Sequence, residues 1–262
     1  MIIRHDIDPA LYLVAPEQFS AVIAVDSFQE EVLLTYDQID ELLKPSLVIS
    51  IQPEPEFYAR CDGMGTLIQP NWILSAAHVA TEICLDKPID IAESAFAIKQ
   101  IVLHPQFRDC SERAVLAKYD IALIQLEQSV EAITPFPLYQ STDELGRIVT
   151  LVGRGDFGTG LIGPDQVDGE LRIATNQIEQ VDEQWLISHF DPPPHCTKLE
   201  GVSGPGDSGG PVLIETGEGW AIAGISSGQK SFNLGEGRYG VQEYYTRVST
   251  QIDWIESVIS SA

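Results

Sequence analysis

The sequence predicts an all-β protein, built as a barrel or a sandwich. Short apolar runs recur along the 262 residues, and turn residues separate them at regular intervals. The chain contains 21 glycines and 16 prolines, a content that suits many tight turns between strands. Many short strands joined by turns rich in glycine and proline are typical of β-barrels and β-sandwiches.

The N-terminal half offers two alternatives for its first strand. Residues 20–25 form one candidate and residues 47–51 form the other. Between them, residues 39–43 have the apolar spacing of one short helix. Further strands are expected over residues 95–98, 100–103 and 121–126.

The C-terminal half repeats the strand pattern and ends in a helix. Its strands are expected over residues 148–153, 170–174, 185–188, 211–214 and 220–225. Residues 253–259 have apolar positions at helical spacing, and Ser249 and Thr250 are the two candidate N-caps.

The composition excludes several classes of partner. The net charge is −24, from 15 basic and 39 acidic residues, and such a surface repels nucleic acids and anionic membranes. No apolar run reaches the roughly 18 residues of a transmembrane helix. The first 25 residues lack the pattern of a signal peptide, so the chain either starts after a removed signal or is never exported, and the compartment stays open. Four cysteines without a C-x-x-C pair predict no structural zinc site, and we expect no metal or cofactor.

One stretch predicts the chemistry. Residues 204–211 read Gly-Pro-Gly-Asp-Ser-Gly-Gly-Pro, which places Ser208 where another molecule can approach it closely. A serine hydroxyl needs a base beside it, and the base needs an orienting partner. The chain supplies both candidates, because His78 follows an apolar run and Asp120 opens another.

These motifs, in the order His78, Asp120, Ser208, resemble the chymotrypsin-like serine peptidases of the trypsin family. The resemblance covers roughly residues 60–262. Its matching stretches are 65–68 with 76–78, 120–123, 206–211, 224–227 and 245–248. It implies two six-stranded antiparallel β-barrels with a cleft between them and a C-terminal helix. The implied divisions of a single peptidase domain (1–262) are an N-terminal barrel (1–140) with an acidic insertion near 27–57, a C-terminal barrel (141–248) and a helix (249–262).

The resemblance implies a serine endopeptidase that acts on protein or peptide substrates as a monomer. His78 would be the general base, Asp120 its orienting carboxylate and Ser208 the nucleophile that forms an acyl-enzyme. The N–H groups of Gly206 and Ser208 would form the oxyanion hole. The alternative is a latent zymogen or a non-catalytic binding module with the same fold.

The resemblance also implies an activation pair between a buried N-terminal ammonium, assigned to Ile2, and Asp207. This assignment favours residues 21–25 over 47–51 as the first strand. A disulfide common in relatives is missing, because its two positions hold Gly63 and Val79. Cys61 and Cys84 either form a displaced version or are free thiols, and the states of Cys110 and Cys196 are open as well.

Substrate-binding residues follow from the same alignment. They are Val202, Ser203, Ser227, Gly228 and Gln229. Val202 carries no charge for a basic side chain, so we expect small or medium apolar side chains first. Basic side chains come second, because Glu243 would reach the pocket floor if the register of the following strands is kept.

Overall fold

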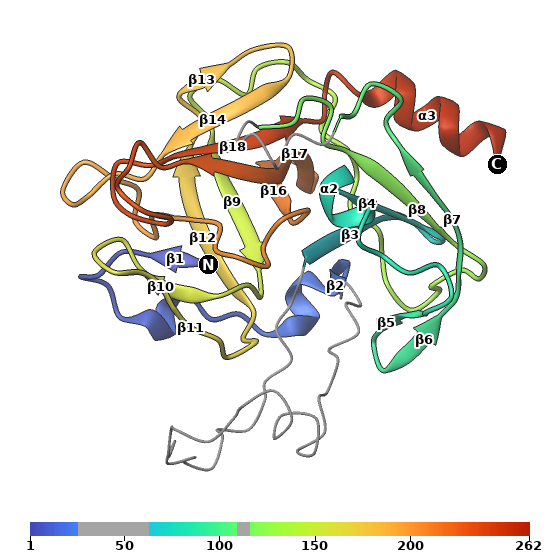
Figure 1. Ribbon diagram of the computed structural model, residues 1–262, viewed down its shortest axis with the longest axis horizontal. Coiled ribbons are helices and arrows are strands. Elements are labelled where there is room, and N and C mark those ends of the chain that lie inside the picture. Colours follow the sequence, from blue (N-terminus) through green and yellow to red (C-terminus); the bar gives the residue numbers. More distant parts are fainter. Residues whose placement is uncertain (26–62, 109–115) are drawn as a thin grey trace, which may run out of the picture.

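The computed structural model describes residues 1–25, 63–108 and 116–262. Two large curled β-sheets form the body of the molecule, one from each half of the chain (Figure 1). The predicted acidic insertion, the short helix over 39–43 and the competing strand over 47–51 lie outside the described residues.

The first sheet comes from the N-terminal half. Among the described residues it has five strands in the order β2-β3-β4-β8-β7, and every neighbouring pair is antiparallel. The strands are β2 (Val22–Val25), β3 (Gly63–Gln69), β4 (Trp72–Ser75), β7 (Ile98–Leu103) and β8 (Ala122–Leu126), with a separate hairpin of β5 (Ile89–Ile91) and β6 (Ser94–Phe96). Because β2 pairs with β3, residues 22–25 provide a strand of this sheet, as the first of the two alternatives predicted.

The second sheet comes from the C-terminal half and has seven strands in the order β12-β9-β16-β17-β18-β14-β13. The strands are β9 (Ile148–Gly153), β12 (Arg172–Gln177), β13 (Gln180–Val181), β14 (Trp185–His189), β16 (Pro211–Thr216), β17 (Gly219–Lys230) and β18 (Gln242–Arg247). Buried aliphatic side chains such as Leu151, Val212 and Ile214 line its concave side. Each strand predicted for this half is present; β9 has the predicted ends, and the ends of the others are shifted.

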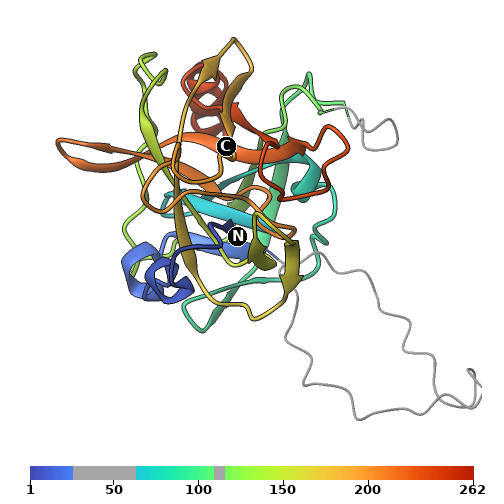
Figure 2. The same ribbon diagram turned by 90° about the vertical axis from the view of Figure 1, so that its left-hand side faces the viewer.

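A third, smaller sheet builds the N-terminus into the fold. Its order is β11-β10-β1-β15, with β1 (Ile2–Ile3), β10 (Phe157–Thr159), β11 (Gly163–Gln166) and β15 (Gly201–Val202). The chain start lies inside the outline of the molecule in both views (Figures 1 and 2). The side chains of Met1, Ile2 and Ile3 are almost fully buried, so this end of the chain is part of the core.

Two α-helices matter for the site and for the chain's end. Helix α2 (Ala77–Ala80) is a single turn between β4 and β5, and α3 (Ile252–Ser261) is the predicted C-terminal helix. Two short 3₁₀ helices, η1 (Pro9–Tyr12) and η2 (Pro16–Phe19), precede β2. No helix in the described ranges has the length and apolar content to cross a membrane.

The predicted N-cap of α3 is wrong. The residue at that position is Gln251, and its side chain does not cap the helix. Ser249 instead donates its hydroxyl to Glu144, and Thr250 donates its hydroxyl to the Arg247 carbonyl. Both hydroxyls are therefore used before the helix begins.

Candidate active site

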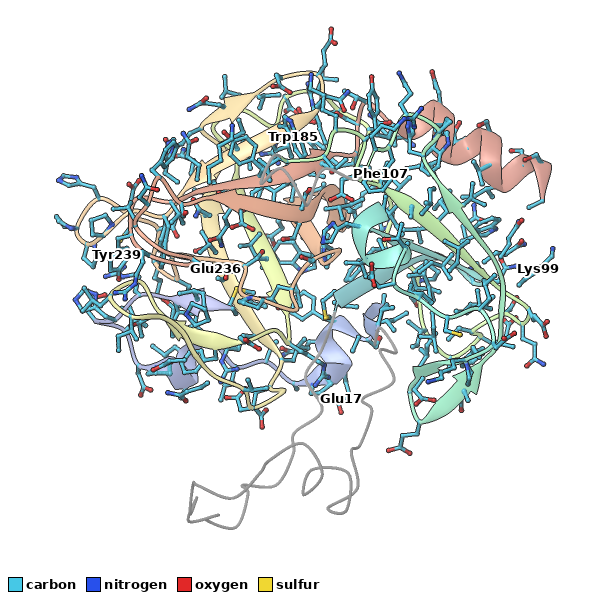
Figure 3. All side chains as sticks on the ribbon, in the orientation of Figure 1. Glu17, Lys99, Phe107, Trp185, Glu236 and Tyr239 are labelled. Atoms are coloured by element: carbon cyan, nitrogen blue, oxygen red, sulfur yellow. The ribbon has the colours of Figure 1, made fainter. Side chains whose placement is uncertain are left out.

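His78 lies on the one-turn helix α2, directly after the buried strand β4. Ala77 and Ala80 of this helix pack with Ala122 and with Phe107, which is labelled in Figure 3, in one apolar cluster. The side chain of His78 is 35% exposed, so its ring is accessible while its backbone is fixed.

Asp120 orients His78 through two hydrogen bonds. One carboxylate oxygen, Oδ1, accepts from the His78 backbone N–H at 2.9 Å, and the other, Oδ2, lies 2.7 Å from His78 Nδ1. The carboxylate is 2% exposed. Tyr119 precedes it with φ of 57°, and this left-handed turn ends at the start of β8. The arrangement fixes both the ring plane and the nitrogen that carries a proton.

Two residues of the second sheet complete the surroundings of Asp120. Ser227 donates its hydroxyl to Asp120 Oδ2 at 2.5 Å, and Thr246 donates its hydroxyl to the Asp120 carbonyl at 2.9 Å. The carboxylate that holds His78 is thus tied to both halves of the chain. Ser227 was predicted to bind substrate, and this stays a prediction; its hydroxyl contacts Asp120.

The turn that carries Ser208 packs against the segment leading to His78. The Ser208 carbonyl accepts from the Met64 N–H at 2.7 Å, and the Met64 carbonyl accepts from the Ser75 hydroxyl at 2.7 Å. Gly209 has φ of 81°, and a Cβ there would meet the Met64 carbonyl, Ser75 Oγ and, at 3.2 Å, the Ala76 nitrogen. Only glycine allows this approach, which brings Ser208 beside residues that immediately precede His78.

The oxyanion-hole candidates lie on the same turn. Gly206 has φ of 88°, and the neighbouring N–H groups of Asp207 and Gly210 close the turn on the carbonyls of Gly204 and Asp207 at 3.0 Å each. In the part of the chain that the structure describes, the N–H groups of Gly206 and Ser208 donate to no protein acceptor. Both are therefore available to a ligand.

The activation pair differs from the prediction. The ammonium that meets Asp207 belongs to Met1, at 2.6 Å from Oδ2, and it also donates to the Asp156 carbonyl at 2.5 Å. Ile2 was predicted in this role. The backbone of Ile2 lies in β1, between β10 and β15, and its side chain packs with Phe190 and Val202. The ammonium group that pairs with Asp207 therefore lies one residue earlier than predicted.

Glycines make room for the Asp207 carboxylate, which accepts from the N–H groups of Gly155 at 2.6 Å and Gly204 at 2.9 Å. A Cβ at Gly153 would collide with Asp207 Oδ1, and a Cβ at Gly155 would lie 2.6 Å from the Asp207 nitrogen. In the sequence, the two glycines of Gly153-Arg154-Gly155 are the signal of this close approach.

The predicted substrate-binding residues lie in different surroundings. Val202 is fully buried in the apolar cluster with Ile2 and Phe190, and its role in substrate binding stays a prediction. Ser203 and Gln229 do lie together, because the Gln229 amide nitrogen donates to the Ser203 carbonyl at 2.7 Å. Ser203 Oγ is 2.7 Å from Ser226 Oγ, which donates to Glu243 at 3.3 Å.

Gly228 and Gln229 border a cavity of about 720 Å³. The cavity lies beside the exposed end of β17, and Trp185 marks its position in Figure 3. Its apolar wall is formed by Leu116, Trp185, Ile187 and Tyr244. Gly228 has no side chain to fill this space, so the cavity adjoins the strand on which the substrate-binding residues were predicted.

The cysteines are only partly placed. Cys84 and Cys196 are free thiols, and Cys61 and Cys110 lie outside the described residues. Among the residues described, no group of three or more His, Cys, Asp or Glu side chains has the arrangement of a metal site.

The order and pairing of these sheets, with the C-terminal helix, define the chymotrypsin-like two-barrel fold. The model of the family described as Trypsin matches residues 56–255, and the chain belongs to this family of serine peptidases. It is 29% identical over 232 residues to chymotrypsin-like elastase family member 1 of Felis catus, covering 79% of this chain and 81% of that protein. It is 28% identical over 234 residues to chymotrypsin-like elastase family member 3B of Macaca mulatta, covering 81% and 88%.

Proposed function

We propose that this protein is a serine endopeptidase with His78, Asp120 and Ser208 as its catalytic triad. The observation that carries the proposal is the 2.7 Å contact between His78 Nδ1 and Asp120 Oδ2, beside the turn that carries Ser208. The elastase names of the relatives support peptide hydrolysis as the reaction.

The proposed reaction has two acyl-transfer steps. Ser208 Oγ attacks the peptide carbonyl while His78 takes the hydroxyl proton, and His78 then gives that proton to the departing amine. Water next attacks the acyl-enzyme with His78 again as the base, and Ser208 is released. Asp120 holds the required tautomer and stabilises the imidazolium.

The N–H groups of Gly206 and Ser208 are the proposed donors to the tetrahedral oxyanion. Each such donor typically contributes about 3 kcal/mol of transition-state stabilisation. The contact of Met1 with Asp207 supports a competent turn over a latent one, because it fastens the residue between these two donors.

The proposal treats residues 1–262 as one peptidase domain. Its N-terminal barrel provides His78 and Asp120, and its C-terminal barrel provides Ser208. The substrate backbone would lie along β17, next to Ser227, by addition of a strand to the sheet edge.

Hydrolysis of a peptide library tests the proposal. We expect cleavage by the unaltered protein and a loss of at least about 10³-fold in kcat for Ser208→Ala and for Asp120→Asn. The matched control is Ser257→Ala, since Ser257 is an exposed serine of α3 whose hydroxyl donates only to the Trp254 carbonyl. Equal cleavage by Ser208→Ala and the unaltered protein would contradict the assignment.

A further inference from the structure

The feature that carries a further inference is the carboxyl group of Glu243 on β18. The register of β17 and β18 places Gln229 opposite Glu243, so the two side chains share one face of the sheet. Glu243 is fully buried, and its Oε1 accepts from Ser226 at 3.3 Å. Its Oε2 is buried without a hydrogen-bond partner among the described residues. A buried carboxyl oxygen without a hydrogen bond lowers the stability of the folded protein, and a donor that reached it would restore that stability.

Gln229 lies opposite Glu243 and connects β17 to two other segments. Its side-chain nitrogen donates to the Ser203 carbonyl at 2.7 Å, and its side-chain oxygen accepts from the Gly237 N–H at 3.0 Å. Gly237 belongs to the loop that also carries Glu236 and Tyr239, on the side of β1 in Figure 3. The side chain of Gln229 therefore spans from β17 to two other segments, while remaining partly exposed itself.

The residues around Glu243 are connected to the triad. Ser203 precedes Ser208 by five residues in the same glycine-rich segment, and Gln229 follows Ser227, whose hydroxyl contacts Asp120. A substrate side chain that entered here would belong to the residue whose carbonyl Ser208 attacks. This step rests on the proposed function.

The polar groups around Glu243 fit a cation. The hydroxyls of Ser203 and Ser226 lie 2.7 Å apart and can accept from an ammonium or guanidinium, while the unpartnered Glu243 oxygen offers the opposite charge. The net charge of −24 also favours the approach of a basic peptide. We propose that Glu243 is the specificity-determining residue for Lys or Arg side chains. The Gln229 side chain must move aside to admit them.

Binding of a cation at Glu243 is linked to the release of the proton that this carboxyl group carries. Burial, together with the nearby charge of Asp207, raises the pKa of Glu243 to about 8, although hydrogen bonds from Ser203, Gln229 and Ser226 favour the ionised form. Tyr245 on β18 also interacts electrostatically with Glu243, and the Met1 ammonium is paired with Asp207. Below about pH 8, Glu243 must therefore release its proton to solvent when it binds a cation.

Binding of benzamidine, compared with neutral benzamide, tests this proposal by calorimetry. The measurement needs no catalysis, so failure of the peptidase assignment and failure of this inference give different results. We expect benzamidine to bind at least about tenfold tighter than benzamide at pH 8. Its affinity should fall by about tenfold for each pH unit below 8, with release of a proton in buffers of different ionisation enthalpy.

Three variants sharpen the test. Glu243→Gln should lose both the preference for benzamidine and its pH dependence, while Glu215→Gln, which removes an exposed carboxylate of β16, should keep both. Gln229→Ala should bind benzamidine about tenfold more tightly, because two hydrogen bonds no longer have to break. Equal affinities for the charged and neutral ligands, or an unchanged preference in Glu243→Gln, would overturn the role of Glu243. Unchanged or weaker binding by Gln229→Ala would overturn the proposal that the Gln229 side chain must move aside.

Discussion

The ammonium of Met1 lies 2.6 Å from Asp207 Oδ2, with both side chains at most 2% exposed. Because the same carboxylate accepts from Gly155 and Gly204, the turn before Ser208 is fastened to the N-terminus and to the segment after β9. A buried ion pair that loses one partner leaves the other charge uncompensated.

Asp207→Asn should therefore destabilise the protein by about 3–5 kcal/mol. The free energy of unfolding from denaturant titration measures this loss. Asp165→Asn is the control, because Asp165 is exposed on β11. Equal stability of the two variants would show that the Met1 contact contributes nothing to the fold.

Gly209→Ala should destabilise the protein by about 3 kcal/mol or more. The residue has φ of 81°, and a Cβ would meet backbone atoms of Met64 and Ala76 that cannot easily move. Gly217→Ala is the matched control, since a Cβ there meets nothing within 4 Å. The midpoint temperatures of thermal unfolding of the two variants test this prediction. A midpoint for Gly209→Ala as high as that for Gly217→Ala would contradict the close packing at Gly209.

The pair of Glu144 and Arg247 joins the start of the second sheet to its last strand. Two guanidinium nitrogens donate to the carboxylate, at 3.0 Å and 2.7 Å, and Glu144 is fully buried. Glu144→Gln should lower the free energy of unfolding by about 3 kcal/mol. Replacing Asp6, which forms an exposed pair with Arg4, should leave the unfolding midpoint unchanged. A loss of similar size for both changes would argue against a special role for the buried pair.

Glu243 should make the protein less stable as the pH rises. Its pKa is raised by burial from the ordinary value of 4.5 to about 8, so between these values the folded chain keeps a proton that the unfolded chain has lost. Stability should fall through this window by up to about 1.4 kcal/mol per pH unit. Glu243→Gln removes this contribution, so its advantage over the unaltered protein should grow from about pH 5 to pH 8. A constant difference in unfolding free energy would contradict a buried, protonated Glu243.

The local patterns of the sequence predicted much of the fold. Apolar runs such as residues 148–153 and 185–188 became strands at nearly the expected positions, because their side chains fill the core. The strand β1 was not predicted, since two residues carry no periodicity and its partners lie more than 150 positions away. The cap of α3 was misassigned because Ser249 satisfies Glu144, a residue distant in sequence.

The sequence predicted the site residues that lie in recognisable motifs. It did not predict the contacts between segments that are distant in sequence. His78, Asp120 and Ser208 each lie in a recognisable motif. The contact of Ser227 with Asp120 depends on how the two sheets meet, and the ammonium at Asp207 depends on the pairing of β1. The proposed role of Glu243 depends on a strand register that only the structure provides, and on that ground we propose basic side chains ahead of the apolar ones that the sequence favoured.

Labelling with a fluorophosphonate probe, followed by mapping of the modified peptide, tests the central claim most directly. The probe reacts with a serine that a neighbouring base activates. The account predicts one adduct per chain, on Ser208, and none in His78→Ala. An adduct on another serine, or an unlabelled Ser208 in the folded protein, would contradict it.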